Sequence, residues 1–317
     1  MRGLVALALA VALASTAVVH AAERLYRVGV LTPSDNQWEP EAFQEALRAL
    51  GHADGLLIDV RSAEAALERL PALAEDLVRT APDVILAVNT PGSRAVIDTG
   101  TRIPIVMAVV GDPVSLGFVD NLARPGKNVT GISNVAADLT AKRLALFKEA
   151  VPSLVRVAVL YHPDEPIARI QMQELASPAR ALGLEFRFAP VRSIDDLERA
   201  FDAAAAWGAH GVFRLAGQAI TLAAQTNELA LRHRMPLMAL QGTDVRNGAL
   251  ISYFANQSEL YRRAAVYVDR ILKGTAPGAL PIEQPTRFEL FVNIRTARAL
   301  GMTIPQTVLL RADEVIE

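Results

Sequence analysis

The sequence predicts an α/β protein made of two doubly wound halves, each with a mostly parallel sheet covered by helices on both faces. Short apolar strands alternate with helical patterns, and the same alternation restarts near residue 155. Strands such as 83–88 are apolar on both faces, which is typical of strands buried between two layers of helices. The length agrees, since 317 residues minus a leader of about 21 leave room for about two domains of roughly 150 residues.

In the first half, each element follows from its hydrophobic pattern and its flanking turn residues. Residues 26–31 form a β-branched run that stops at a turn cluster, Thr32 to Asp35, and a helical pattern then ends at Gly51. The alternation continues to residue 133. We expect strands over 26–31, 56–60, 83–88, 103–110 and 128–133, and helices over 39–50, 65–80 and 93–98.

The second half repeats this order after a helix over 139–151. We expect strands over 155–161, 184–190, 211–215, 236–240 and 249–253, and helices over 166–182, 194–207 and 219–233. A helix over 257–272 and an alternating segment over 282–292 come after both halves are complete. The C-terminal part of the chain must therefore return to one or both halves.

Composition and motifs exclude several functional classes. The 34 acidic and 32 basic residues give a net charge of −2 without a block of like charges, so we expect no nucleic-acid partner. The chain has no cysteine, which removes disulfides, thiolate nucleophiles and cysteine-bound metals. Motifs for zinc proteases, serine hydrolases and nucleotide-phosphate binding do not occur. We therefore expect neither catalysis nor a cofactor or metal.

The first residues have the pattern of a secretory signal peptide. Arg2 gives a short positive region, residues 4–19 are apolar, and Val19-His20-Ala21 is a small-residue cleavage pattern. The alternative is a membrane anchor, but about 16 apolar residues fall short of the ~20 that a spanning helix needs. We expect cleavage after about Ala21 and, in a double-membrane bacterium, a periplasmic protein.

The candidate site residues come from the strand-to-helix loops, because open α/β sheets bind ligands outside the carboxyl ends of their strands. These loops cover residues 32–38, 89–93, 111–114, 162–166, 216–218 and 241–244.

Two loops of the first half offer complementary charges. Asn89, Thr90 and Pro91 stand at a helix start, where the dipole and the backbone N–H groups favour an anion such as a carboxylate. The alternative is that Thr90 only caps the helix, with Pro91 at its first position. Asp112, beside Gly111, could accept from a ligand ammonium, or could only hydrogen-bond its own turn.

Five further residues complete the candidate set, and four of them have a structural alternative. Trp38, in the same loop as Ser34, could stack on a ligand or cover the edge of the domain. Tyr161 and Asp164 have the same ambiguity in the first loop of the second half. Asp244 could contact the ligand, or be a turn residue or a surface charge.

Several segments together resemble the tryptophan/tyrosine-type ABC transporter substrate-binding proteins. They match in order over nearly all of the chain after the leader, which makes the resemblance specific. The segments are Pro71 to Val78, Asp83-Val84-Ile85 with Thr90-Pro91, Ile103 to Val106 with Gly111-Asp112-Pro113-Val114, Leu122 to Gly126 with Asn128 to Gly131, Gln284-Pro285-Thr286, Phe288-Glu289-Leu290 and Ile294 to Ala297.

This resemblance implies a type I periplasmic binding protein, in which two lobes joined by three crossovers close on a small ligand. It implies delivery of that ligand to a membrane permease with an ATPase, and it places Thr90, Pro91, Gly111 and Asp112 at the cleft. We expect a monomer with a leader over 1–21, a first lobe from 22–133 plus about 255–278, and a second lobe from 134–254 plus about 279–317.

The ligand we expect is an amino acid or a related carboxylate. The helix N-termini and Thr90 would hold its carboxylate, Asp112 its ammonium, and Trp38 or Tyr161 its side chain. The chain departs from the family pattern at Asn89, where a small residue is usual, and at Phe254, where glycine is common. Bulkier groups there would change the pocket size, so the ligand need not be aromatic.

Two other functions stay open at this stage. The same lobes could serve a sensor kinase or chemoreceptor in place of a transporter, and sequence does not separate the two. An exported enzyme on this scaffold would need a base in the cleft, and only His162 is placed even roughly for that. A transcription regulator with similar lobes disagrees with the export signal.

Overall fold

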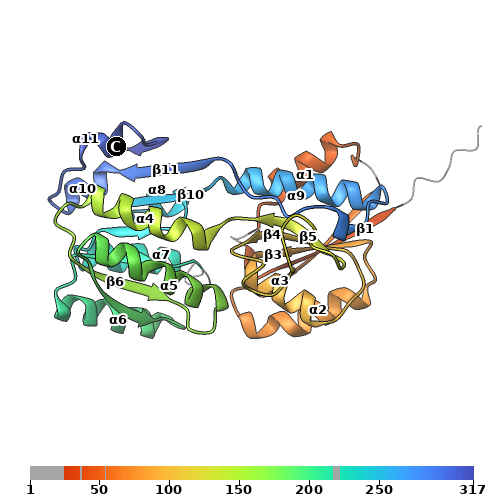
Figure 1. Ribbon diagram of the computed structural model, residues 1–317, viewed down its shortest axis with the longest axis horizontal. Helices are drawn as coiled ribbons and strands as arrows, with labels where there is room; N and C mark the ends of the chain where they lie inside the picture. Colours follow the sequence, from red (N-terminus) through yellow and green to blue (C-terminus); the bar gives the residue numbers. More distant parts are fainter. Residues whose placement is uncertain (1–24, 36–37, 54, 217–221) are drawn as a thin grey trace, which may run out of the picture.

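The computed structural model describes residues 25–35, 38–53, 55–216 and 222–317, and it has two α/β lobes side by side along its long axis (Figure 1). The expected signal peptide lies outside the described residues. Within the described ranges, no helix is both long enough and apolar enough to cross a membrane. The predicted fold class, two doubly wound lobes joined by a three-segment hinge, is confirmed.

The first lobe contains a five-stranded parallel sheet with the order β2-β1-β3-β4-β5. Its central strands β3 and β4 consist of apolar residues that are all buried. Its elements are β1 (Tyr26–Thr32), α1 (Pro40–Ala49), β2 (Leu56–Ser62), the short 3-10 helix η2 (Leu67–Arg69), α2 (Leu70–Arg79), β3 (Val84–Val88), α3 (Asn89–Asp98), β4 (Ile105–Val110) and β5 (Val129–Ser133).

The second lobe contains a seven-stranded sheet with the order β12-β11-β10-β9-β8-β6-β7, in which β11 runs antiparallel to β10. Its elements are α4 (Ala136–Ala150), β6 (Arg156–Tyr161), α5 (Pro166–Ala181), β7 (Glu185–Pro190), α6 (Ile194–Trp207), β8 (Gly211–Arg214), α7 (Ala223–Arg232), β9 (Leu237–Ala239), α8 (Gly242–Arg246), β10 (Ile251–Ala255), β11 (Phe288–Asn293), α10 (Ile294–Ala299), α11 (Gln306–Leu309) and β12 (Glu314–Ile316).

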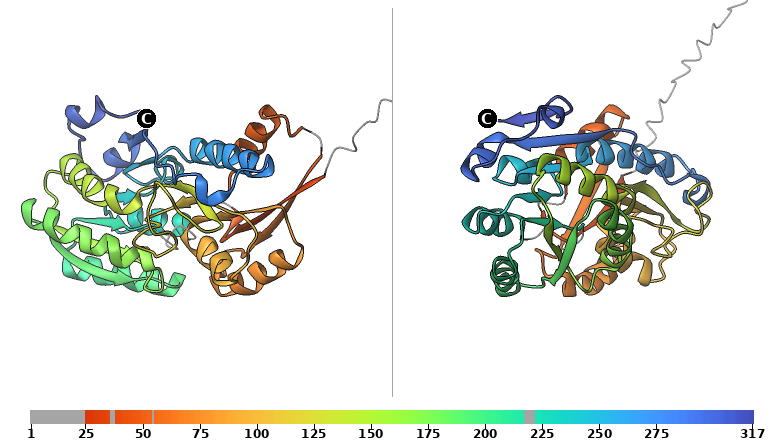
Figure 2. Two further views of the ribbon diagram at one scale, coloured as in Figure 1. Left: turned by 45° about the vertical axis from the view of Figure 1, so that its right-hand side comes forward. Right: turned by 60° about the vertical axis from the view of Figure 1, so that its left-hand side comes forward.

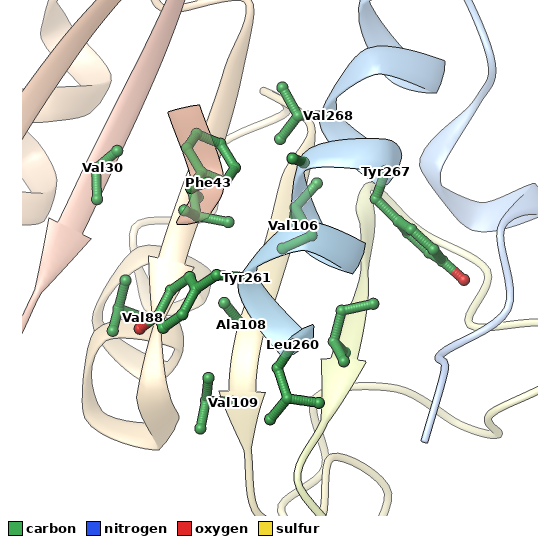
Figure 3. Close-up of a cluster of buried hydrophobic side chains, with 14 of the residues drawn as sticks. Val30, Phe43, Val88, Val106, Ala108, Val109, Leu260, Tyr261, Tyr267 and Val268 are labelled. Carbon is green, nitrogen blue, oxygen red and sulfur yellow. The ribbon is translucent and has the colours of Figure 1, made fainter. Parts of the chain in front are cut away.

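The chain returns to the first lobe through α9 (Gln257–Leu272), which lies beside α1 in Figures 1 and 2. Asn256 starts the helix, because its side chain accepts from the backbone N–H of Glu259 at 2.9 Å. Leu260, Tyr261 and Val268 then enter the same apolar core as the first-lobe strands (Figure 3). The helix thus completes a lobe that ended more than a hundred residues earlier in the chain.

Three segments cross between the lobes: the link from β5 to α4, the link from β10 to α9, and the link from η4 (Pro277–Ala279) to β11. The third is fastened to β5 before it leaves the first lobe. The Thr130 hydroxyl donates to the carbonyl of Leu280 at 2.8 Å. The backbone of Glu283 forms an isolated parallel β-bridge with Ile132. Arg263 on α9 binds the Glu283 carboxylate with two nitrogens, at 2.6 and 2.7 Å.

The structure differs from the predicted elements where local backbone or length works against the pattern. Helix α2 begins at Leu70 and not at 65, because Glu64 and Ala65 have positive φ angles of 52° and 71°. Helix α3 begins at Asn89, four residues earlier than predicted. The segment 282–292 becomes a strand only from Phe288 onward. The elements α8, α10, α11 and β12 were not predicted, and each has six residues or fewer.

Candidate ligand-binding cleft

An enclosed cleft lies between the lobes, outside the carboxyl ends of strands from both sheets. Its cavity volume is about 30 Å³, well below the roughly 300–1,000 Å³ of a typical small-molecule site. The two walls of the cleft therefore lie close together. Its described lining residues are Pro33, Leu67, Asn89, Thr90, Pro91, Val109, Gly111, Asn134, Ala136, Glu165, Ile167, Ala216, Leu240, Gln241, Phe254 and Gln257.

The first-lobe wall is built around the N-terminus of α3. The helix begins directly after β3, and Asn89 makes the turn with a left-handed φ of 56°. This places Asn89, Thr90 and Pro91 in the first helical turn and on the cleft. Thr90 is not the cap residue that the sequence allowed, because the helix starts before it. Its hydroxyl instead accepts from the backbone N–H of Gly111 at 3.4 Å.

A β-bulge shapes the same wall. The register of β4 and β5 shifts between Ala108 and Val110, and the bulged Val109 has a φ of 64°, a strained conformation for a β-branched residue. The side-chain amide of Asn134, at the first crossing, donates to the carbonyl of Val109 at 3.1 Å. Val135, next in the chain, has a φ of 49°. Backbone strain of this kind clusters at ligand sites and hinges.

Gly111 receives a side chain from the opposite lobe. A Cβ atom at Gly111 would lie 2.8 Å from both Cδ1 and Cγ1 of Ile167, closer than real Cβ contacts come. Ile167 belongs to the first turn of α5, in the second lobe, and is 2% exposed. The glycine therefore provides the space into which the second lobe closes.

The second-lobe wall is built from side chains. Glu165, immediately before α5, is 4% exposed, and its backbone N–H donates to the carbonyl of His162 at 3.2 Å. Gln241, immediately before α8, lies on the same wall. Neither was among the predicted site residues, although both stand in the strand-end loops that the sequence identifies. The strand-end rule was the available signal, but it does not say which residue of a loop faces the cleft.

A buried ion pair supports this wall from behind. Arg214, at the end of β8, is fully buried and donates to the carboxylate of Asp244 in α8. Asp244 also accepts from the backbone N–H of Gln241 at 3.2 Å, which holds Gln241 at the cleft. Asp244 thus acts inside the lobe, away from the cleft and from the surface.

A second buried arginine lies beside this pair. Arg143 donates to the carbonyls of Arg214 and Ala239 at 2.8 and 3.0 Å. Burial and the neighbouring Arg214 charge lower the pKa of Arg143 to about 9, against the opposing effect of Asp244. The interior of the second lobe therefore holds two arginines close to a single carboxylate, that of Asp244, which pairs directly with Arg214.

Asp112, Trp38 and Ser34 make their contacts within the first lobe. The Asp112 carboxylate accepts from the backbone N–H of Ser115 at 3.1 Å, which is the turn role that the sequence left open. Trp38 is buried between Phe43 and Tyr261, with 5.2 Å between ring centroids in each case. Ser34 is buried beside Pro33, and its carbonyl accepts from the Thr32 hydroxyl at 2.8 Å.

Tyr161 and Asp164 lie outside the enclosed cleft. Tyr161 packs edge-on against Phe188 of β7, with ring centroids 6.5 Å apart. Asp164 is 66% exposed, and a hydrogen bond from Arg192 lowers the pKa of its carboxyl. Together with His162, it lines a wider groove that adjoins the cleft. The groove and the cleft have four lining residues in common, which are Leu67, Thr90, Pro91 and Glu165.

Comparison with known proteins agrees with this architecture. A crystal structure of a conserved domain protein from Vibrio cholerae is 27% identical, covers 92% of this chain and all of its own, and superimposes with a TM-score of 0.86. A structure from Streptococcus pneumonia in complex with L-Trp is 23% identical, covers 92% of this chain and 99% of its own, and has a TM-score of 0.84.

Sequence comparison points the same way. A tyrosine-binding protein of Clostridioides difficile (strain R20291) is 26% identical over 266 residues, which cover 83% of this chain and 76% of that protein. The family model described as ABC transporter substrate binding protein matches residues 35–316, nearly the whole described chain. The resemblance inferred from the sequence motifs is thereby confirmed. The chain belongs to the family of ABC transporter substrate-binding proteins, which capture small solutes between two lobes for ABC transporters.

Proposed function

We propose that this chain captures an amino acid or a related carboxylate and delivers it to the permease and ATPase of an ABC importer. The observation that carries the proposal is the pairing of opposite charges across one closed cleft. The N-terminus of α3 lies on the first-lobe wall, and the buried carboxylate of Glu165 lies on the second. A zwitterion has the two charges that such walls attract. The tyrosine-binding relative and the tryptophan complex support this ligand class.

The first-lobe wall suits the carboxylate. The N-terminus of a ten-residue helix carries a partial positive charge and directs N–H groups outward. Asn89 and Thr90 add an amide and a hydroxyl at the same place. These residues, with Pro91, form the proposed carboxylate site.

The second-lobe wall suits the ammonium. The sequence assigned this role to Asp112, whose carboxylate caps its own turn in the structure. Glu165 is the acidic residue among the described lining residues of the cleft, and it belongs to the opposite lobe from the helix N-terminus. We therefore assign the ammonium to Glu165.

Lobe closure follows from this division. Because the two charges of the ligand are bound by different lobes, both contacts exist only when the lobes are closed, and the ligand stabilises that state. The leader pattern supports a periplasmic location, and the chain is proposed to work as a monomer.

The test is thermal unfolding of the protein from Ala22 onward, stripped of carried-over ligand by unfolding and refolding, against amino acids, carboxylates, sugars and purines. A ligand at ~100 times its Kd adds about 2.7 kcal/mol, which raises the midpoint by several degrees. An amino acid or a related carboxylate should produce this shift. If only sugars or purines do, or no compound does, the proposed ligand class is wrong.

Two variants then separate the two acidic candidates. Glu165→Gln removes a charge-assisted hydrogen bond of about 1.5–3 kcal/mol, so it should weaken binding by roughly ten- to a hundredfold in isothermal titration calorimetry. Asp112→Asn should change affinity little. The reverse result would return the ammonium to Asp112. The midpoint of each unliganded variant controls for a loss of folding.

A further inference from the structure

We propose that Ile167 sets an upper limit on the size of the solute, so that this chain selects a compact amino acid, with a small aliphatic or polar side chain, over tryptophan and tyrosine. The proposal rests on the proposed function and names the ligand class within it. Three observations support it: the contact of Ile167 with Gly111 across the cleft, the small volume left in the cleft, and the placement of the aromatic side chains.

The side chain of Ile167 reaches across the cleft to the opposite lobe. It extends from α5 of the second lobe and packs against Gly111 of the first lobe, so closely that a methyl group at Gly111 would overlap it. Both residues line the cleft. A branched side chain in van der Waals contact with the opposite wall occupies volume that a ligand side chain would otherwise use.

The remaining space is narrow. The cavity left between the two walls has a volume of about 30 Å³. Large apolar side chains, those of Leu67 and Leu240, also border it. A planar ring as wide as indole requires a continuous slot, and Ile167 interrupts one by reaching from the second-lobe wall to Gly111 on the first. A compact ligand requires a smaller parting of the lobes before its contacts with both walls form.

The aromatic side chains that could stack on a ligand ring are engaged elsewhere. Trp38 is packed between Phe43 and Tyr261 in the first-lobe core, and Tyr161 packs on Phe188. Phe254 is the one aromatic residue among the described lining residues. The cleft therefore lacks, in its described part, the pair of ring faces that would favour an aromatic ligand.

The experiment measures affinity for alanine, serine, valine, tyrosine and tryptophan by isothermal titration calorimetry, in the wild type, Ile167→Ala and Ile170→Ala. Ile170 is the matched control, because it lies one turn further along α5 and packs against the first-lobe core without lining the cleft. We expect the wild type to bind at least one compact amino acid about tenfold or more tightly than either aromatic one.

Ile167→Ala should shift this ratio toward tyrosine and tryptophan by about tenfold or more, which is the scale on which a hydrophobic pocket discriminates by size. Ile170→Ala should leave the ratio unchanged, even if it weakens all ligands alike through lost lobe contact. Ile167→Val should give an intermediate shift, and it keeps the test valid if the alanine variant folds poorly.

Gly111→Ala provides an independent test of the contact between Gly111 and Ile167. The added methyl meets Ile167 and should hold the lobes apart, so every amino acid that binds should bind more weakly. Combining Gly111→Ala with Ile167→Ala should restore much of that loss. If the double variant binds as weakly as Gly111→Ala alone, the contact between the two residues is not what limits closure, and the proposal fails.

The outcomes separate this proposal from the one on which it rests. Tight binding of tyrosine or tryptophan by the wild type, or an unchanged ratio in Ile167→Ala, overturns the size limit and leaves amino-acid capture standing. Binding of no amino acid overturns the size limit, and it overturns both proposals if no carboxylate raises the thermal midpoint either. Compact selectivity that relaxes in Ile167→Ala and not in Ile170→Ala supports both.

Discussion

The two walls of the cleft are built differently. The first-lobe wall depends on backbone: a helix that begins in a left-handed turn at Asn89, and a bulge with a strained Val109. The second-lobe wall depends on side chains, Glu165, Ile167 and Gln241. Substitutions on the second wall should therefore change which ligand binds, whereas the first wall should resist substitution because its chain path itself forms the site.

The supports behind the walls differ as well. The first lobe buries an apolar core that α9 completes, with Leu260 and Tyr261 against strands whose residues are all buried. The second lobe places Arg143, Arg214 and Asp244 in its interior, at the ends of β8 and β9. A buried charge without its partner costs far more than a lost apolar contact, so the second lobe is the more sensitive to single polar substitutions.

The largest effect is expected for Asp244→Ala. It leaves Arg214 buried without its counter-charge and releases the backbone N–H of Gln241, so the free energy of unfolding should fall by about 3–5 kcal/mol. Urea unfolding followed by circular dichroism measures this. Asp164→Ala is the control, because it breaks an exposed pair with Arg192 in the same lobe and should change little. Equal losses in the two variants would contradict the sensitivity of the buried pair.

A smaller effect tests the backbone character of the first wall. Asn89→Ala places a Cβ at a φ of 56° without the local hydrogen bonding of asparagine, whereas Asn89→Gly permits that angle freely. We expect the alanine variant to be less stable than the glycine variant by about 1–2 kcal/mol in urea unfolding. If alanine proves as stable as glycine, the left-handed turn is not what position 89 requires.

The smallest effect concerns acid. Burial lowers the pKa of His162, with a partial opposing effect of Asp164, so the folded protein favours the neutral ring. The unfolded chain then binds more protons near its ordinary pKa of about 6.5, and His162 should cost stability as the pH falls from 7.5 toward 5.5. Urea unfolding at both pH values should show a smaller loss in His162→Gln. An identical loss would mean that His162 does not contribute.

Much of the fold could be predicted because local patterns encode it. The predicted bounds of α6 and α9 are those of the structure, and most strands agree within about two residues. Helix α8, strand β12 and the short C-terminal helices escaped prediction because fewer than two turns or a three-residue strand leave no periodicity to detect. The antiparallel direction of β11 depends on where the third crossing re-enters the lobe, which its own sequence does not state.

The site could be predicted in part. Asn89, Thr90, Pro91 and Gly111 line the cleft, as does Phe254. Trp38 and Tyr161 belonged to the right loops but pack against distant aromatic residues of their own lobes. Glu165 was in a loop that the strand-end rule identifies, but a loop position alone does not give a side chain its direction.

The sequence by itself determined the two doubly wound lobes, the family and the set of loops that surround the cleft, because periodicity, turn residues and family motifs are local properties of the chain. Only the tertiary structure decided which side chains fill the cleft and which lock the lobes. Those choices rest on pairs that are far apart in sequence, Gly111 with Ile167 and Trp38 with Tyr261. Trp38 meets Tyr261 only when α9 returns to the first lobe, and Gly111 meets Ile167 only when the two lobes close, so no single segment of the sequence determines either contact.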